Sequence, residues 1–322
     1  MTFNTDFCYA YGKPLATGAI RSCPEDFKVF EIPDFGLCGS GEHVYLKIRK
    51  TNANTGWVAA QLAEFAGISH KDIGFAGRKD RYAITEQWFS CYLPGERDIE
   101  WEGLEIEGVE LLDVTRHTKK LRKGDLTGNL FELTLRHIAD RHAVEKSLNR
   151  VRDSGVPNYF GEQRFGRDNG NLDFADKLLK GCPAKGCPAE GCRSIRHNRD
   201  IYLSAARAYM FNHFLSTKIR RRSWEEISAI EFGPLYGMSR DPREGENDLP
   251  RECQQWCAGL QSLRIKSGTR NLKLRPKNLQ WRFSGDSLQL TFALTAGSFA
   301  TSLLREVLDY NSTHKESNPS SE

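Results

Sequence analysis

The residues best suited to chemistry lie between Gly74 and Ser90, where the sequence reads GFAGRKDRYAITEQWFS. One aspartate, Asp80, stands there between Lys79 and Arg81, after an apolar run with glycines and before a run of β-forming residues. Nearby cations favour the ionised form of a carboxylate, and an ionised carboxylate in a pocket can act as a nucleophile or a base. Asp80 is therefore a candidate catalytic residue, and an ordinary surface ion pair is the alternative.

Length and composition set the class of protein that must hold this segment. The chain has 322 residues, enough to bury a core and to form two domains. No apolar run reaches membrane-spanning length and the N-terminus lacks a signal-peptide pattern, so we expect a cytoplasmic protein. The nine cysteines are an odd number, which favours free thiols in a reducing compartment.

Basic residues are clustered although the net charge is only +4. Each cluster taken alone is typical of a solvated face, but three in one chain favour a polyanionic partner. We refer to them as the first, second and third basic blocks: Arg116, His117, Lys119, Lys120, Arg122 and Lys123; Arg220, Arg221 and Arg222; Lys266, Arg270, Lys273, Arg275 and Lys277.

Periodicity predicts strands in both outer parts of the chain and helices between them. The predicted strands are 26–32, 44–48, 87–93, 111–115, 130–135, 279–283 and 288–294. The predicted helices are 54–66, 139–154, 172–179, 201–219 and 298–308. This order predicts an α+β fold in which a mostly helical domain, 157–272, is inserted into a domain formed by 1–156 and 273–310, with a disordered tail at 311–322.

Several motifs of the chain match one family. Around Asp80 they are Ala76, Gly77, Lys79, Asp80, Arg81, Ala83, Thr85 and Gln87. The others are Glu25–Phe27 with Val29, Thr51–Asn52, Lys120–Leu121, Gly124–Leu126, Gly128–Asn129 with Phe131, Val156–Gly161, Gln163–Gly166 and Gly297–Thr301. In these residues the chain resembles the TruD family, the tRNA pseudouridine(13) synthases, over almost its whole length.

The resemblance implies a pseudouridine synthase catalytic domain, with a mixed or antiparallel sheet and flanking helices, and an inserted TRUD-type domain. The implied activity is that of an isomerase, an intramolecular transferase, that turns uridine 13 in the D-arm region of tRNA into pseudouridine. Asp80 is then the catalytic residue, and no metal or cofactor is needed. Attack on the sugar, attack on the base and assistance to a glycal route all stay open. We expect tRNA as the partner, with no membrane and no protein partner, and a monomer.

A base inside folded RNA must be flipped out and then held by stacking and by hydrogen bonds to its edges. The resemblance places Phe27, Asn129 and Phe299 at the substrate uridine. Phe131 is a further candidate, because two residues along a strand it shares a face with Asn129. The Asn129 amide can pair with a uracil edge, whereas ordinary core packing is the alternative for each phenylalanine.

Pseudouridine synthases generally pair their aspartate with a basic residue. Arg305 on the last predicted helix is the candidate partner of Asp80, and Lys79 or Arg81 could serve instead. For Arg305 the alternative is an exposed arginine on a helix surface.

Three cysteines and a histidine, Cys182, Cys187, Cys192 and His197, recur at five-residue steps and could ligate zinc. Their spacing is not that of a standard zinc knuckle, so we predict a loop without metal and keep zinc as the alternative. Two other functions also stay open: an RNA-binding or chaperoning protein in which Asp80 is structural, and an N-glycosidase that cleaves the bond without rejoining it.

Overall fold

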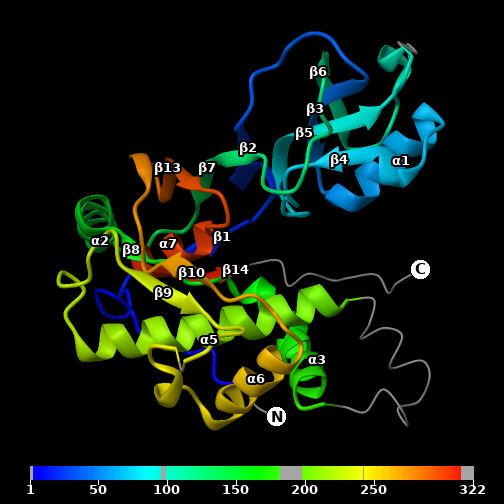
Figure 1. The fold of residues 1–322 in the computed structure, drawn as a ribbon. Helices are drawn as coiled ribbons and strands as arrows, with labels where there is room; N and C mark the ends of the chain where they lie inside the picture. The colour runs from blue at the N-terminus through cyan, green and yellow to red at the C-terminus, as the bar shows by residue number, and fades with distance from the viewer. Residues whose placement is uncertain (1–2, 96–98, 182–197, 242, 313–322) are drawn as a thin grey trace. The chain divides into compact units, whose positions relative to one another are not determined.

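The computed structural model describes residues 3–95, 99–181, 198–241 and 243–312, and the chain forms two compact units (Figure 1). We call one the sheet unit; it comprises Leu15–Ala143, Pro276–Gly297 and Leu308–Glu322. We call the other the helical unit; it comprises Met1–Pro14, Val144–Arg275 and Ser298–Val307. Each unit is therefore built from segments that are far apart in the sequence.

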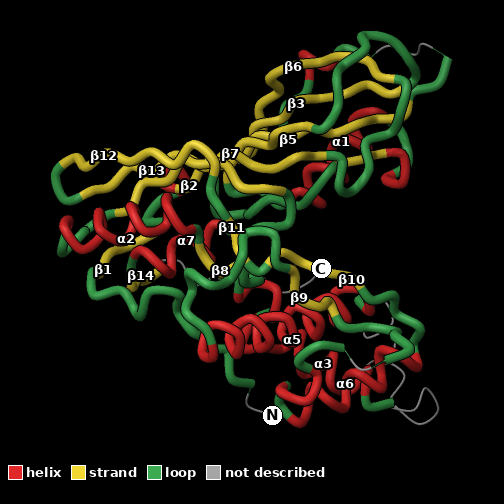
Figure 2. The backbone as a smooth tube through the Cα atoms, turned by 60° about the vertical axis from the view of Figure 1, so that its left-hand side comes forward, coloured by secondary structure: helices red, strands yellow, loops and turns green. Residues whose placement is uncertain are grey.

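An eight-stranded mixed sheet forms the sheet unit (Figure 2). Its strands follow the order β12 (Lys277–Ser284), β13 (Ser287–Thr295), β7 (Leu126–Leu135), β2 (Phe27–Pro33), β5 (Ile84–Tyr92), β3 (His43–Thr51) and β6 (Val109–His117), and β4 (Ile73–Phe75) also pairs with β5. Only β2 and β5 pair in parallel; the other neighbours in this sheet are antiparallel. The short strands β1 (Thr17–Ile20) and β14 (Asp309–Ser312) form a separate parallel pair.

Helix α1 (Thr55–Ala66) covers one face of β3 and β5 (Figure 1). Val58 and Leu62 on its apolar side are fully buried and belong to one core with Leu46 and Phe89 of the two strands. The helix ends at Gly67, whose φ of +60° is the left-handed conformation that glycine adopts without a steric penalty. This helix holds one side of the segment that leads to Asp80.

The long helix α5 (Arg199–Arg221) is the centre of the helical unit, and α3 (Gly170–Leu179) and α6 (Arg251–Ser262) lie beside it (Figure 1). Its core contains fully buried aromatic side chains, among them Tyr209, Phe211 and Trp256. Two short antiparallel pairs, β9 (Phe232–Leu235) with β10 (Gly268–Asn271) and β8 (Val156–Pro157) with β11 (Lys273–Leu274), complete this unit with α7 (Ala300–Val307). Helix α2 (Arg141–Ser154) begins in the sheet unit and continues into the helical unit.

The predicted α+β class is confirmed, with a mixed sheet and helices in the expected order. The helical unit extends beyond the predicted insert, 157–272. It also includes residues 1–14, 144–156, 273–275 and 298–307, which the sequence assigned to the other domain, and the domain boundaries stay a prediction. Asn311 and Ser312, predicted to belong to a disordered tail, pair with β1 instead, because they extend the short parallel ladder that begins at Asp309.

Across the described residues, no helix is long and apolar enough to span a bilayer. The run from Cys182 to His197 lies outside the residues that the structure describes. The six cysteines that it does describe are free thiols.

Candidate active site around Asp80

Asp80 lies in the loop between β4 and β5, and its carboxylate contacts a guanidinium of the same unit. Arg21 Nη2 is 3.2 Å from Asp80 Oδ2, with 17% of the arginine side chain and 30% of the aspartate side chain exposed. Arg21 directly follows β1 and has a φ of +56°, which is uncommon for a residue other than glycine and typical of functional sites. The carboxylate is thus held by one cation and remains open to a ligand.

A buried lysine fixes the backbone of this loop. Lys50 on β3 is fully buried, and its Nζ donates to the carbonyls of Asp80, at 2.8 Å, and of Ala53, at 2.7 Å. Burial lowers the pKa of Lys50 to about 8, and the charge of Asp80 partly opposes this shift. The backbone amide of Lys79 also donates to Thr55 Oγ1, at 3.0 Å. Such contacts hold a reactive side chain in one position, as a catalytic constellation requires.

Lys79, which the sequence offered as a possible partner of Asp80, pairs with Glu31 in the structure. Lys79 Nζ lies 2.5 Å from Glu31 Oε2, and the two side chains are only 5% and 1% exposed. The reason lies in the sheet, since β2 and β5 pair in parallel only up to Phe30. Beyond that residue the Trp88 amide donates to Glu31 Oε1 at 3.2 Å instead of to a strand carbonyl. The buried carboxylate that results requires a cation, and Lys79 supplies it.

Arg21 contacts both Asp80 and the ring of Phe27. The guanidinium carbon of Arg21 is 4.1 Å from the Phe27 ring centroid, which is cation–π geometry. Phe27 packs edge-to-face on Phe131 at 6.3 Å, and Phe131 stacks on Phe292 at 5.3 Å. Phe27 and Phe131 are 2% and 5% exposed, so both rings are packed in the core, and their contact with a uridine stays a prediction.

Asn129 on β7 has an unused hydrogen-bond acceptor. Asn129 lies opposite Glu31 of β2, so their side chains share one face of the sheet. Phe131 lies opposite Val29 in the same way. The Oδ1 atom of Asn129 is buried and has no hydrogen-bond partner in the part of the chain that the structure describes. An orphan polar atom of this kind costs free energy unless a ligand or water satisfies it, and an N–H donor on a base would do so.

Phe299 and Arg305 belong to the helical unit. The Phe299 ring lies 6.0 Å from that of Phe160. The Arg305 guanidinium lies 4.2 Å from the ring centroid of Tyr9 and donates to the Phe7 carbonyl at 2.6 Å. The role of Phe299 at the uridine and the pairing of Arg305 with Asp80 stay predictions.

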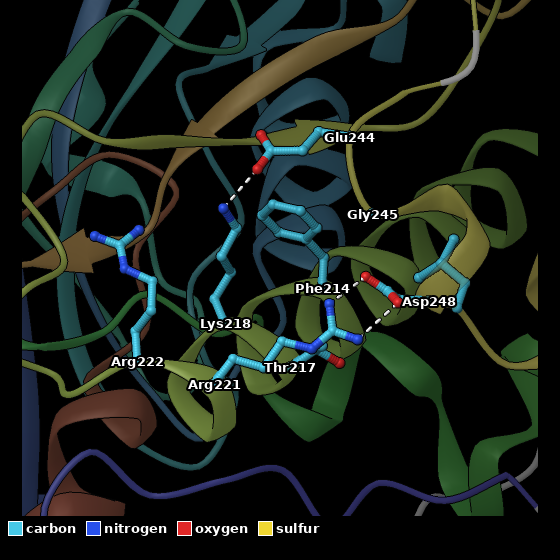
Figure 3. Close-up of a pocket in the computed structure, with 9 residues that line it drawn as sticks. Phe214, Thr217, Lys218, Arg221, Arg222, Glu244, Gly245 and Asp248 are labelled. Atoms are coloured by element: carbon cyan, nitrogen blue, oxygen red, sulfur yellow. Dashed lines mark hydrogen bonds and ion pairs between the residues drawn. The ribbon is translucent and has the colours of Figure 1, made fainter.

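Two arginines of the second basic block, Arg221 and Arg222, pair with carboxylates of their own unit. Arg221 makes two hydrogen bonds to Asp248, at 2.7 and 2.8 Å, as Figure 3 shows, and Arg222 Nη1 donates to Glu231 at 2.9 Å. In the third block, Lys273 is buried and its Nζ donates to a backbone carbonyl. These contacts reduce the cationic surface that either block offers to a polyanion.

Three residues of the site were not predicted from the sequence: Arg21, Lys50 and Glu31. No local pattern marks them, because each reaches the Asp80 loop from a strand or strand end distant in sequence. Residues suited to hold a metal do not gather anywhere within 3–95, 99–181, 198–241 and 243–312, and the proposed zinc ligands lie outside these ranges.

Comparisons with known proteins show which family the chain is similar to. The model of the family tRNA pseudouridine synthase D (TruD) matches residues 5–183. The tRNA pseudouridine synthase D of Cellvibrio japonicus is 43% identical over 96% of this chain and 94% of its own length. That of Nitrosococcus oceani is 39% identical over 93% of each chain.

A solved structure shares the fold. The crystal structure of the putative tRNA pseudouridine synthase D from Methanosarcina mazei superposes with a TM-score of 0.66, at 20% identity, over 95% of this chain and 96% of that one. The fold is therefore the α+β fold of the pseudouridine synthases that the resemblance implied. From its sequence and from its fold, the chain belongs to the tRNA pseudouridine synthase D (TruD) family.

Proposed function

We propose that this protein converts a uridine of tRNA into pseudouridine and that Asp80 is the catalytic residue. The two relatives named above are tRNA pseudouridine synthases D, and their similarity extends over almost the whole chain. The observation that carries the residue assignment is the state of the Asp80 carboxylate, which is 30% exposed and contacts one guanidinium in a loop anchored by Lys50. A carboxylate that only stabilised the fold would not need a loop held in this way.

The reaction breaks the bond between uracil N1 and the ribose, turns the base, and joins ribose to C5. The C5 proton must leave and N1 must gain a proton, so the atoms balance without a cofactor. Asp80 supplies the carboxylate for attack or proton transfer, and Arg21 orients it. Asn129 Oδ1 supplies an acceptor for an N–H on the uracil edge, which satisfies that buried atom. The roles of Phe27, Phe131 and Phe299 at the uridine are part of the proposal, as is position 13 of tRNA.

The test is an assay with unmodified tRNA and detection of pseudouridine by carbodiimide adducts. Asp80→Asn is expected to abolish pseudouridine formation and to leave tRNA affinity within a few-fold. Asp113→Asn, which changes an exposed aspartate on β6, is the matched control and is expected to retain full activity. A tRNA with cytidine at position 13 tests the position. Normal activity of Asp80→Asn would refute the residue assignment.

The same assay separates the other functions. Abasic sites in the product would indicate an N-glycosidase that cleaves without rejoining. Tight binding with neither pseudouridine nor abasic sites would indicate an RNA-binding or chaperoning protein.

A further inference from the structure

The sheet unit contains a hollow that does not include Asp80 and whose lining differs in chemistry from the residues around Asp80. It has a volume of about 870 Å³, which falls within the range of sites that hold small organic ligands. Its walls come from the segment after β2, from β3, from the end of β6 and from the loop that joins β6 to β7. The first basic block lies in these last two segments.

One part of the lining is aromatic. The rings of Phe35 and Tyr45 are 5.3 Å apart, those of Tyr45 and His117 are 4.9 Å apart, and those of Phe35 and His117 are 6.1 Å apart. Tyr45 is buried and its hydroxyl donates to the Lys119 carbonyl at 3.0 Å, which fixes the loop to the strand. Phe35 and His117 are half-buried, so their rings are available for stacking.

Another part of the lining is cationic. Lys119 and Arg122 are exposed, and neither side chain forms an ion pair among the described residues. Lys120 also lines the hollow. Asp34 and Asp125 are the acidic members, so three cations and two carboxylates leave a net charge of +1 with the histidines neutral. This differs from the pocket of Figure 3, where Lys218 and Arg221 are bound to carboxylates.

The hollow is linked to the segment of Asp80 by the backbone. Gly124 donates from its amide to the Ala76 carbonyl at 2.8 Å, and the Leu121 amide donates to Ser90 Oγ at 3.0 Å. The loop that carries the cations is therefore fixed to the start of the Asp80 loop and to β5. An RNA bound at Asp80 would have neighbouring nucleotides on the same unit.

We propose that this hollow holds one nucleotide of the RNA substrate other than the uridine that is isomerised. Its base stacks against Phe35 and His117, and its phosphate lies at Lys119 and Arg122. Stacking on aromatic rings combined with cations for the backbone is how proteins bind unpaired RNA. The proposal rests on the proposed function only in taking tRNA as the polyanion, and its test measures binding rather than isomerisation.

The test compares tRNA binding by fluorescence anisotropy over a range of salt concentrations. The double variant Lys119→Gln/Arg122→Gln is expected to weaken binding several-fold and to reduce the slope of log Kd against log salt by about 1. Its matched control is Lys146→Gln/Arg251→Gln, which removes one exposed lysine and one exposed arginine elsewhere and is expected to keep the slope within error. A slope and affinity equal to wild type in the first double variant would overturn the proposal.

The aromatic half is tested with Phe35→Leu, for which we expect a loss of affinity of about 5- to 100-fold from the loss of stacking. Thermal melting shows whether this variant is folded, and ultraviolet cross-linking of the wild-type complex gives a readout that needs no variant. A nucleotide adduct on the peptide holding Phe35 or His117 is expected, from a position other than the isomerised uridine. Its absence, together with unchanged binding of Phe35→Leu, would refute stacking.

Uridine 5′-monophosphate and inorganic phosphate distinguish the source of the nucleotide. Neither compound is expected to bind the hollow below millimolar concentration. The proposal would be overturned if the free nucleotide bound at micromolar concentration and the double variant still bound tRNA like wild type. If the wild type forms no pseudouridine but the double variant still loses affinity, the proposed function fails and the hollow stands. If the wild type forms pseudouridine and the double variant binds tRNA as tightly as wild type, the proposed function stands and the proposal for the hollow fails.

Discussion

Replacement of Arg21 by alanine should impair catalysis more than replacement of Arg81, the exposed cation that follows Asp80 in sequence. Arg21 is the residue whose guanidinium contacts the Asp80 carboxylate, at 3.2 Å, and it also lies on the Phe27 ring. Arg81 is exposed, and its Nε makes a long hydrogen bond, 3.4 Å, to the Asn52 carbonyl. The comparison therefore separates contact in space from proximity in sequence.

The magnitude follows from the type of contact. A hydrogen bond to a charged group contributes about 1.5–3 kcal/mol, and the cation–π contact holds the guanidinium in place. If this free energy orients Asp80 in the transition state, its loss lowers kcat by about 10- to 150-fold. Because 30% of the Asp80 side chain is exposed to solvent, we expect the lower half of this range.

The assay is single-turnover pseudouridine formation with saturating tRNA, together with measured tRNA affinity. Arg21→Ala should lower the rate at saturation and change the affinity by less than about threefold, because the residue positions a catalytic group. Arg21→Lys keeps the charge and loses the planar contact with Phe27, so it should recover part of the rate. Arg81→Ala should stay within about twofold of the wild-type rate.

Two outcomes would refute the reasoning. One is a rate for Arg21→Ala within twofold of wild type. The other is an equal loss for Arg21→Ala and Arg81→Ala, which would mean that overall positive charge near Asp80 matters and that the specific contact does not.

Two further predictions concern stability. Glu31→Gln should lower the free energy of unfolding by about 3–5 kcal/mol, because it leaves the Lys79 charge buried without a carboxylate. The double variant Glu31→Gln/Lys79→Met should recover much of the lost stability. A loss below about 1 kcal/mol for Glu31→Gln in thermal denaturation would contradict the prediction. Burial raises the pKa of Glu306 from 4.5 to about 7, so the folded state holds a proton more tightly than the unfolded state. The stability from this group is present below about pH 4.5 and is lost as the pH rises through 7, by at most about 3 kcal/mol. Urea denaturation at pH 5 and pH 8 should show a smaller difference for Glu306→Gln than for wild type; equal differences would exclude this role.

Most of the sheet and the longer helices follow from patterns that the sequence carries locally. In β2, residues Phe27, Val29 and Glu31 are buried and alternate with more exposed ones, as period-2 patterning predicts. Helix α6 was missed although Cys253, Trp256 and Leu260 form its buried face, because few large apolar residues mark that face and polar residues stand between them. The parallel pair of β1 and β14 was also missed, since four-residue strands that meet from opposite ends of the chain leave no local signal.

The candidate site could be predicted only as far as its motif residues. The sequence offered Arg305 as the partner of Asp80, with the adjacent cations Lys79 and Arg81 as alternatives. In the loop, however, Lys79 turns to Glu31 and Arg81 to the Asn52 carbonyl. Arg21 reaches Asp80 because β1 ends beside the Asp80 loop, which is a tertiary contact that neither composition nor spacing encodes.

The three cations around this loop have different partners, and this difference bears on reactivity. Lys79 pairs with Glu31, and Lys50 donates to backbone carbonyls. Among the residues that the structure describes, Arg21 is the cation that contacts the Asp80 carboxylate. A carboxylate enclosed by several cations would lose basicity and nucleophilicity, whereas one left without any would be poorly oriented. Because Lys79 and Lys50 fix the loop without contacting the carboxylate, Asp80 can be held rigidly and keep one side free for the uridine. The exchange of these partners, for example by Glu31→Gln, should therefore affect catalysis as well as stability.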